Sequence, residues 1–251
     1  MENIDKFNGK AETYEKFRPS YPEELIKDLI AEHSLDQHKV VADIGSGTGM
    51  MAKALLDHHV KVIAIEPNDD MRRIAEERLH SNPLFTAVNG TAEQTTLKSN
   101  SVDLITVAQA FHWFDPEQFK KECQRILKPN RKVILVWNRR VTENQLIQET
   151  ITLYKKYCPN FHGFSEGIEQ NSDIYLTFFR NGNYQFKSYD HPLYYNIEGF
   201  IGRHLSASYA PKPDDQHFHE FIEAFSELFH KYSKDGIIMM PHVTHSYSGN
   251  V

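Results

Sequence analysis

Residues 40–49 read Val40-Val41-Ala42-Asp43-Ile44-Gly45-Ser46-Gly47-Thr48-Gly49, and this stretch decides the fold. Its apolar beginning predicts a short buried strand, its glycines predict a tight turn, and a helix is expected from about residue 50 to residue 56. Glycine has no Cβ and tolerates positive φ, so the backbone of such a turn approaches a ligand closely. The N–H groups that open the next helix point at that ligand. The stretch therefore predicts an α/β fold with a binding site at the turn.

Two classes of cofactor use glycine turns of this kind. The dinucleotide fingerprint is G-x-G-x-x-G, and its third glycine is replaced here by Met50. Asp43 precedes the turn, where a carboxylate would repel a pyrophosphate but suits a cationic, amine-bearing ligand. Glu66 follows a strand expected over 60–65, about 20 residues past the glycines, where an acid can accept hydrogen bonds from ribose hydroxyls. On these residues alone, the alternative that Asp43 only caps the turn and Glu66 is a solvated strand end stays open.

Several motifs resemble those of class I S-adenosylmethionine-dependent methyltransferases. Residues 43–49 look like motif I of that family, and Ile65-Glu66-Pro67-Asn68 looks like its motif II. The similarity extends to residues 90–93, 103–114 and 127–129, and upstream to Phe7, Ala11, Tyr14 and Arg18-Pro19-Ser20-Tyr21-Pro22. This upstream part resembles the first segment of the small-molecule, methyltransferase type 11-like branch. Because the motifs cover residues 7–140 in the expected order, the resemblance implies S-adenosyl-L-methionine as the cofactor and methyl transfer as the reaction.

The composition of the chain limits which classes of partner the protein is expected to bind. The chain has 251 residues, of which 40% are hydrophobic and 25% charged, as in a soluble domain with a sizeable core. The net charge of -6 argues against a nucleic-acid substrate, and Arg139-Arg140 is interpreted as a solvated pair. No apolar run approaches a membrane span, and Cys123 and Cys158 show no redox spacing. We expect a cytoplasmic protein without nucleic-acid or membrane partners, and nothing in the sequence indicates an oligomeric state.

The histidines raise the question of a metal site. The chain contains 14 of them, but His58 and His59 are adjacent and diverge on a helix. His217 and His219 are two residues apart and do not share a helix face either. No histidine cluster has the Cys/His spacing of a zinc site, so no metal is predicted.

Alternating strand and helix patterns predict a doubly wound α/β fold. Strands are expected at about 39–44, 60–65, 85–88, 102–108, 133–137, 184–191 and 237–247. Helices are expected at about 22–32, 48–57, 69–80, 115–127, 144–157, 197–209 and 215–232. The resemblance implies a seven-stranded, mostly parallel, Rossmann-like sheet whose last strand is antiparallel.

The whole chain, residues 1–251, is expected to form one class I methyltransferase domain. Residues 1–35 would be an N-terminal segment and helix. Residues 193–235 would be a helical insertion between the last two strands. In the resembled family such insertions form a lid, so this one is expected to cap the acceptor pocket.

The resemblance also implies a set of cofactor-binding residues. The glycine turn would approach the cofactor backbone, with Asp43 near its amino-acid end and Glu66 on the ribose hydroxyls. Arg18 and Tyr14 would contact the carboxylate, which suits the bidentate fork of arginine. The full set is Tyr14, Arg18, Asp43, Gly45, Ser46, Gly47, Glu66, Pro67, Asn68, Ala92, Glu93 and Gln109.

The expected catalytic residues are Gln109, His112 and Trp113. Gln109 ends the fourth strand, at the sheet edge where open α/β folds bind ligands. Trp113 would either line the pocket beside the sulfonium, through cation–π attraction, or pack in the core. His112 is the candidate general base, because an uncharged imidazole accepts a proton near neutral pH. A carboxylate acceptor would need no base.

The acceptor is expected to be a small molecule, with a carboxylate or a ring metabolite as candidates. The residues expected to contact it are Tyr21, His112, Trp113, Arg203, Ser206 and Tyr209. Arg203 in a lid predicts an anionic acceptor, whereas the alternative is a helix end whose serines cap backbone groups. Two other functions stay open: an NAD(P)-dependent oxidoreductase on a similar sheet, and a non-catalytic module that binds S-adenosylmethionine.

Overall fold

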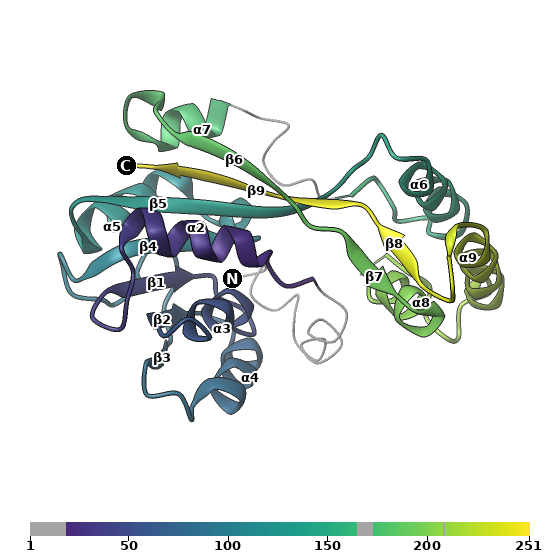
Figure 1. Cartoon of the computed structure of the whole chain (residues 1–251), viewed down its shortest axis with the longest axis horizontal. Helices are drawn as coiled ribbons and strands as arrows, with labels where there is room; N and C mark the ends of the chain where they lie inside the picture. The colour runs from purple at the N-terminus through teal and green to yellow at the C-terminus, as the bar shows by residue number, and fades with distance from the viewer. Residues whose placement is uncertain (1–18, 165–172, 208) are drawn as a thin grey trace.

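A seven-stranded sheet runs through the larger part of the molecule (Figure 1). The computed structural model describes residues 19–164, 173–207 and 209–251. The strand order is β3-β2-β1-β4-β5-β9-β6. The strands are β1 (Val40–Ile44), β2 (Lys61–Ile65), β3 (Phe85–Val88), β4 (Val102–Ala108), β5 (Leu127–Arg140), β6 (Gln185–Asp190) and β9 (His242–Gly249). Strands β1 to β5 pair in parallel and β9 is antiparallel to both its neighbours, which confirms the expected sheet.

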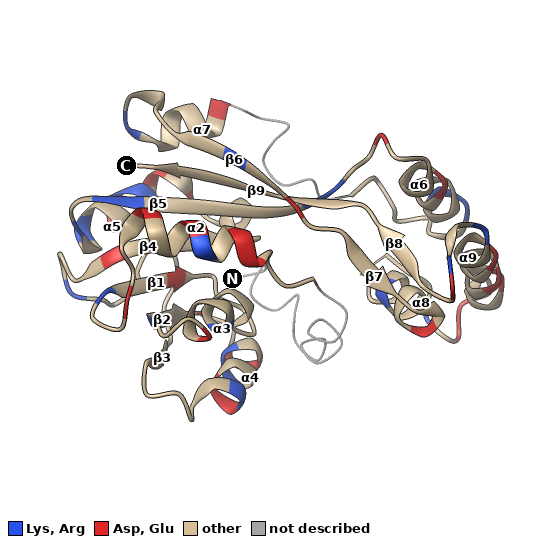
Figure 2. Ribbon diagram, in the orientation of Figure 1, with Lys and Arg blue, Asp and Glu red and all other residues tan. Residues whose placement is uncertain are grey.

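Helices cover both faces of this sheet. On one face, α2 (Glu23–His33), α3 (Met50–Leu56) and α4 (Asp69–Leu79) bury apolar side chains such as Leu25 and Leu55 in a shared core. On the other face, α5 (Pro116–Ile126) and α7 (Asp173–Phe178) pack against it. The rings of Phe119 and Phe178 stack there with centroids 5.5 Å apart. Charged side chains mark the outward turns of helices such as α4 (Figure 2).

Helix starts follow from local sequence. The side chain of Asn68 accepts a hydrogen bond from the backbone N–H of Met71 and so begins α4. Asp115 caps α5 in the same way, and Pro116 occupies the first turn, where its missing N–H costs nothing. These caps fix the helices that follow the second and fourth strands, and with them the loops at the carboxyl edge of the sheet.

A smaller lobe lies beside the sheet (Figure 1). It contains α6 (Gln145–Tyr157), α8 (Ile197–Leu205), α9 (Phe218–Tyr232) and the two-stranded sheet of β7 (Leu193–Tyr195) and β8 (Ile238–Met240). Its core is separate and aromatic, with Phe200, Phe221 and Phe225 fully buried. Strands β5 and β9 reach this lobe from the large sheet and remain paired up to Arg140 and His242.

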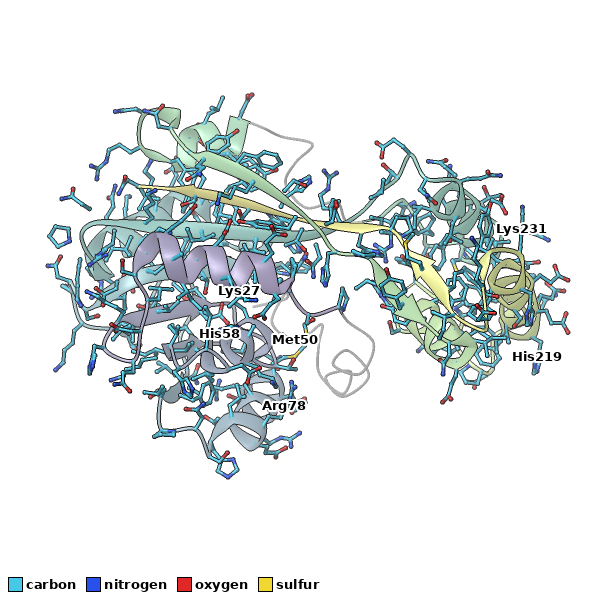
Figure 3. All side chains as sticks on the ribbon, viewed as in Figure 1. Lys27, Met50, His58, Arg78, His219 and Lys231 are labelled. Atoms are coloured by element: carbon cyan, nitrogen blue, oxygen red, sulfur yellow. The ribbon has the colours of Figure 1, made fainter. Side chains whose placement is uncertain are left out.

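Labelled side chains show the relation of the two lobes. Met50, at the start of α3, lies on the side of the large lobe that faces the small lobe (Figure 3). His219 and Lys231, on α9, lie at the far side of the small lobe. The glycine turn that precedes Met50 therefore opens toward the space between the lobes.

The structure departs from the sequence prediction in four places. Strand β5 is longer than 133–137, because its second half pairs with β9 as far as Arg140. The last strand is divided into β8 and β9 at Pro241, which has no N–H to donate. Helix α8 ends at Leu205, where the Ser206 hydroxyl donates to the Arg203 carbonyl. Helix α7 and strand β7 were not predicted, because they contain too few residues for a hydrophobic periodicity to be recognised.

Candidate functional site

A cavity of about 740 Å³ lies at the carboxyl edge of the sheet and extends to the small lobe. This volume is within the range of small-molecule sites. The cavity brings together most of the residues expected from the sequence: Tyr21, Asp43, Gly45, Ser46, Gly47, Glu66, Pro67, Asn68, Ala92, Glu93, Gln109, Trp113, Arg203 and Tyr209.

The glycine turn is fastened to the end of β2. The backbone N–H groups of Gly45 and Ser46 donate to the Ile65 carbonyl at 2.9 and 3.1 Å. Gly45 has φ +67°, and a Cβ added there would lie 2.6 Å from the Cβ of Ala110, so only glycine fits. At Gly47 an added Cβ would meet nothing within 4 Å, because this residue borders the open cavity. The turn is therefore rigid on its inner side and accessible on its outer side.

Asp43 is a buried carboxylate beneath the turn, with 1% of its surface exposed. Its Oδ1 accepts a hydrogen bond from the Thr106 hydroxyl at 3.0 Å, whereas its Oδ2 has no partner in the described part of the chain. Burial raises the pKa of Asp43 to about 7. The hydroxyl oxygens of Ser46 and Thr48 are also buried without a partner among the described residues. Because buried polar atoms are normally hydrogen-bonded, these three cavity-wall residues fit a ligand with polar groups.

Glu66 is held in one orientation by the backbone on either side of it. Its Oε2 accepts from the N–H of Gly47 and its Oε1 accepts from the N–H of Asn68, each at 2.9 Å. Burial raises the pKa of Glu66. Each carboxylate oxygen keeps a second lone pair, so Glu66 can still accept from the hydroxyls of a ligand in the cavity.

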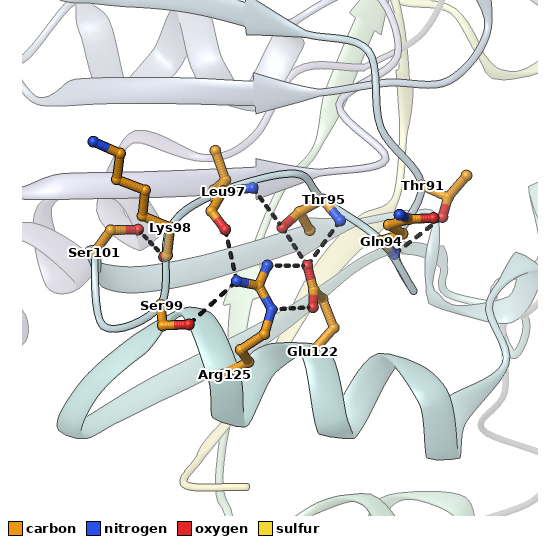
Figure 4. A network of polar contacts seen from close by, with 9 residues as sticks. All are labelled: Thr91, Gln94, Thr95, Leu97, Lys98, Ser99, Ser101, Glu122 and Arg125. Carbon is orange, nitrogen blue, oxygen red and sulfur yellow. Dashed lines mark hydrogen bonds and ion pairs between the residues drawn. The ribbon is translucent and has the colours of Figure 1, made fainter.

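A polar network fixes the loop that carries Ala92 and Glu93 (Figure 4). The backbone N–H and the hydroxyl of Thr95 both donate to Oε1 of the buried Glu122, the former at 2.8 Å. Arg125 donates to both oxygens of Glu122, at 2.7 and 2.8 Å. Because Glu122 and Arg125 belong to α5, this loop is tied to the helix under the sheet, and Ala92 and Glu93 are held at the cavity wall.

The aromatic run after β4 divides between core and cavity. Phe111 is fully buried in the core. Trp113 is 38% exposed and lines the cavity, which favours the pocket interpretation for its indole. Gln109 also lines the cavity and has φ 60°, a left-handed conformation that is uncommon outside glycine. Its backbone N–H donates to the Val136 carbonyl at 2.9 Å, so β5 holds Gln109 in this conformation.

His112 is placed apart from these groups. It is not among the described residues that line the cavity, and its ring centroid is 4.4 Å from that of Trp113. The residue is exposed, but desolvation where its ring packs lowers the pKa of His112 to about 4. The imidazole is therefore uncharged at neutral pH, yet from this position it does not face the cavity. Its role as a base stays a prediction.

The cavity wall opposite the glycine turn is formed by Arg140, Phe164, Arg203, Tyr209 and His242, which we call the arginine wall. Arg203 lies on α8 and is 8% exposed. Arg140 ends β5, with its Cζ 3.9 Å from the centroid of the Phe164 ring. Burial lowers the pKa of His242 to about 3, so this histidine is neutral.

Asn138 connects the N-terminal side of the cavity to the sheet. Its Nδ2 donates to the Ser20 carbonyl at 2.9 Å, and its Oδ1 accepts from the Thr244 hydroxyl at 2.6 Å. Thr244 is in turn 3.1 Å from Nδ1 of His191. This chain of contacts holds the segment before Tyr21 at the cavity wall.

Some sequence expectations differ from what the structure places at the cavity. Ser206 does not line it and instead donates to the Arg203 carbonyl at 2.8 Å, as in the helix-end alternative. Tyr14 and Arg18 lie outside the described residues. The interpretation of Arg139-Arg140 as a solvated pair is wrong for Arg140, which is partly buried and lines the cavity.

The cavity residues that escaped the sequence analysis include Asn138, Arg140, Phe164 and His242. Asn138 and Arg140 are two residues apart on one strand and so share a face. That alternation was the available signal, but it lies beyond the apolar run that marked β5. Phe164 and His242 carry no local signal, because they meet the cavity only through the tertiary fold.

No helix in the described ranges is long and apolar enough to cross a membrane. Within the same ranges, no three His, Cys, Asp or Glu side chains gather as ligands for a metal ion. Cys123 and Cys158 are both free and buried.

Residues 42–135 match the family model described as a methyltransferase domain. This part of the chain is therefore similar in sequence to methyltransferase domains, and the seven-stranded sheet around it has the Rossmann-like fold expected for that class. An uncharacterised methyltransferase of Mycobacterium bovis is 38% identical to this chain over 134 residues, which are 53% of this chain and 52% of that protein. An uncharacterised methyltransferase-like protein of Schizosaccharomyces pombe is 32% identical over 163 residues, or 63% of this chain and 62% of the relative.

Other relatives agree with this class. A "probable S-adenosylmethionine-dependent methyltransferase" of Saccharomyces cerevisiae, CRG1, is 28% identical to this chain over 154 residues, which are 60% of this chain and 52% of CRG1. The chain thus spans between 52% and 62% of the length of these curated relatives.

Solved structures show the same fold. A type II methyltransferase candidate from Anaeromyxobacter dehalogenans matches this chain with a TM-score of 0.69, covering 93% of this chain and 98% of that one at 21% identity. A phosphoethanolamine N-methyltransferase from Haemonchus contortus, solved with S-adenosylhomocysteine, matches with a TM-score of 0.55, covering 99% of this chain and 59% of that one at 14% identity. At these identities the similarity establishes the fold alone.

Proposed function

We propose that this protein transfers a methyl group from S-adenosyl-L-methionine to a small-molecule acceptor bound in the cavity. The observation that carries the proposal is the set of buried polar atoms at the glycine turn, namely Asp43 Oδ2 and the hydroxyl oxygens of Ser46 and Thr48. They lie beside Glu66 and fit a cofactor that combines positive charge, an amine and hydroxyl groups. The pyrophosphate of a dinucleotide would instead meet Asp43.

Each part of the cofactor has residues suited to it. Asp43 suits the cationic amino-acid end, and the fixed carboxylate of Glu66 suits the ribose hydroxyls. The remaining wall residues would flank the adenine: Pro67, Asn68, Ala92 and Glu93. The S-adenosylhomocysteine in the Haemonchus contortus structure supports this cofactor for the same fold.

Methyl transfer requires the protein mainly to orient the acceptor and the cofactor relative to each other. When bound, the cofactor supplies an electrophilic methyl group: a lone pair of the acceptor forms the new bond, the carbon–sulfur bond breaks, and its electron pair remains on sulfur. Gln109 and Trp113 line the cavity after β4 and would hold the acceptor in line with that bond. Correct alignment of reactants is worth a large part of the barrier in such displacements. The indole of Trp113 would also stabilise positive charge through cation–π attraction.

Other assignments complete the proposal. The small lobe, including the expected insertion at residues 193–235, would cap the acceptor. Tyr14 and Arg18 would bind the cofactor carboxylate, and Tyr21 and Tyr209 would contact the acceptor. His112 would act as a base only for an acceptor that loses a proton. We place the reaction in the cytoplasm.

Titration calorimetry with S-adenosylmethionine and with NADH tests the cofactor. We expect S-adenosylmethionine to bind and NADH not to bind, and the reverse result would favour an oxidoreductase. The protein is then incubated with methyl-labelled cofactor and a metabolite extract, and S-adenosylhomocysteine and labelled products are measured. Tight cofactor binding with no labelled product in any extract would favour a non-catalytic binding module. Glu76→Gln, an exposed position on α4, is the matched control for acid variants in the site.

A further inference from the structure

The charged residues of the cavity are segregated by sign. The acidic residues in its described lining are Asp43, near the end of β1, and Glu66 and Glu93, in loops that follow β2 and β3, so all three belong to the large lobe. The two arginines in that lining, Arg140 and Arg203, belong to the opposite wall. A cavity with one acidic and one basic end favours two ligands of opposite charge.

Arg140 is held in a fixed orientation. It lies across from His242 in the β5–β9 pairing, at the end of that strand pair. Its guanidinium carbon lies 3.9 Å from the centroid of the Phe164 ring. A guanidinium carries five N–H donors in a planar fork that matches the oxygens of a carboxylate or a phosphate.

Arg203 reaches the cavity from a different element. It lies near the end of α8, is 8% exposed, and hydrogen-bonds the hydroxyl of Tyr195. The main chain of this turn is secured by the Ser206 hydroxyl, which donates to the Arg203 carbonyl. Arg203 therefore brings a guanidinium group to the cavity wall from a helix, whereas Arg140 comes from a strand.

The fields of the two arginines overlap. Burial is the main cause of the lowered pKa of His204 and of His242, and the positive charges of Arg140 and Arg203 lower both pKa values further. Both histidines are therefore neutral, and Tyr195 and Tyr209 keep their protons because burial raises their pKa. At neutral pH the charge of the arginine wall comes from its two guanidinium groups.

We propose that the methyl acceptor carries an oxyanion, a carboxylate or a phosphate, and that Arg140 and Arg203 bind it together. This inference rests on the proposed methyl transfer, because it treats the arginine wall as the acceptor side of a cavity whose acidic side holds the cofactor. Two arginines on separate elements can donate to one oxyanion from two directions, which fixes its position as well as its charge. Neutral molecules of the same shape are then poor acceptors.

The test uses the full chain saturated with S-adenosylhomocysteine and measures binding by calorimetry. The probes are benzoate, cinnamate and succinate, with their neutral amides, and phenyl phosphate and ethanolamine phosphate, with phenol and ethanolamine. We expect at least one oxyanion to bind at least tenfold more tightly than its matched neutral or dephosphorylated compound. The carboxylate and phosphate arms show which oxyanion the site takes.

The variants Arg140→Gln and Arg203→Gln identify the groups responsible. Each is expected to weaken binding of that oxyanion at least tenfold while S-adenosylhomocysteine affinity stays within threefold. Arg73→Gln, an exposed position on α4, is the control and is expected to leave both affinities unchanged. Thermal unfolding of each variant checks folding, and the two arginines lie on different elements, so one misfolded variant does not remove the test.

Three results would overturn the inference: equal binding of the oxyanions and their matched compounds, no binding of any oxyanion, or unchanged oxyanion binding in both arginine variants. Failure of the proposed function gives a different pattern, because S-adenosylmethionine and S-adenosylhomocysteine then fail to bind the unaltered protein. The oxyanion titrations are repeated without cofactor, so they report on the arginines in that case as well.

Discussion

The two sides of the cavity are built in different ways. The acidic side comes from short consecutive stretches: residues 43–48 after β1, 66–71 after β2 and 91–93 after β3. The arginine wall collects Arg140, Phe164, Arg203 and His242 from segments far apart in the chain. The first side is a property of one fold motif, whereas the second depends on how the small lobe packs on the ends of β5 and β9. Cofactor choice and acceptor choice are thus encoded in separate parts of the sequence.

The largest effect that separates the two sides is expected for the buried acids. Asp43→Asn and Glu66→Gln each remove a charge that we assign to the cofactor, which costs about 1.5–3 kcal/mol for a charged hydrogen bond, or about ten- to a hundredfold in affinity. Calorimetry with S-adenosylmethionine measures this loss, with Glu76→Gln as control. Unchanged affinity in both variants would show that Asp43 and Glu66 do not bind the cofactor. The distinction between a cofactor side and an acceptor side of the cavity would then be wrong as well.

A pH series sharpens the same comparison. Burial raises the pKa of Asp43 from its ordinary 3.8 to about 7, so the cofactor-free protein holds a proton there at pH 6. Between pH 3.8 and 7 this carboxyl group is ionised in the unfolded chain but still protonated in the folded one. Its contribution to the free energy of unfolding therefore decreases as the pH rises through this range. A cationic ligand favours the ionised form, so cofactor affinity should rise by up to about tenfold per pH unit below pH 7 and level off above it.

The control for this series is Asp43→Asn, titrated at the same pH values. Subtracting its profile removes the titration of the ligand itself and of Glu66. If the slope below pH 7 persists in Asp43→Asn, the proton belongs to another group and the position assigned to the amino-acid end is wrong.

A smaller effect is expected for Thr95→Val, which removes one hydroxyl donor from Glu122 in the network of Figure 4. The free energy of unfolding should fall by about 1 kcal/mol, because the backbone N–H of Thr95 and Arg125 still satisfy the carboxylate. Thermal unfolding checks this against Thr152→Val, an exposed threonine whose hydroxyl donates within α6. A loss no larger than that of Thr152→Val would show that the network does not stabilise the loop.

The smallest effect is expected for His112→Gln. A positioned general base contributes about 10²–10⁴ in rate, whereas a residue outside the cavity lining should change turnover by less than about threefold. Turnover with an acceptor found in the metabolite screen is the measurement. A loss above about a hundredfold would restore His112 as the base.

The sequence was informative where function and local structure coincide. Gly45, Glu66 and Asn68 belong to loops that directly follow apolar strands, so strand spacing together with the resemblance to methyltransferase motifs placed them at one edge of the sheet. Gln109 and Trp113 were found for the same reason. The prediction for Arg140 was wrong, because its only local signal, the alternation with Asn138, lies beyond the apolar run and does not show that β5 pairs with β9 to its last residue. His242 and Phe164 depend on tertiary packing of the small lobe, which no short-range pattern reports.

The continuity of β5 and β9 has a consequence for how acceptor preference can evolve. Side chains alternate between the faces of a strand, so Asn138 and Arg140 share the cavity face with His242 and Thr244 across the ladder. Deleting Trp137 or Asn138 would reverse the facing of the β5 residues that follow, so that Arg139 would take the cavity-facing place of Asn138 while His242 and Thr244 on β9 keep theirs. A single indel at this point could therefore create a new acceptor specificity in one step, without any change to the part of the gene that encodes the glycine turn.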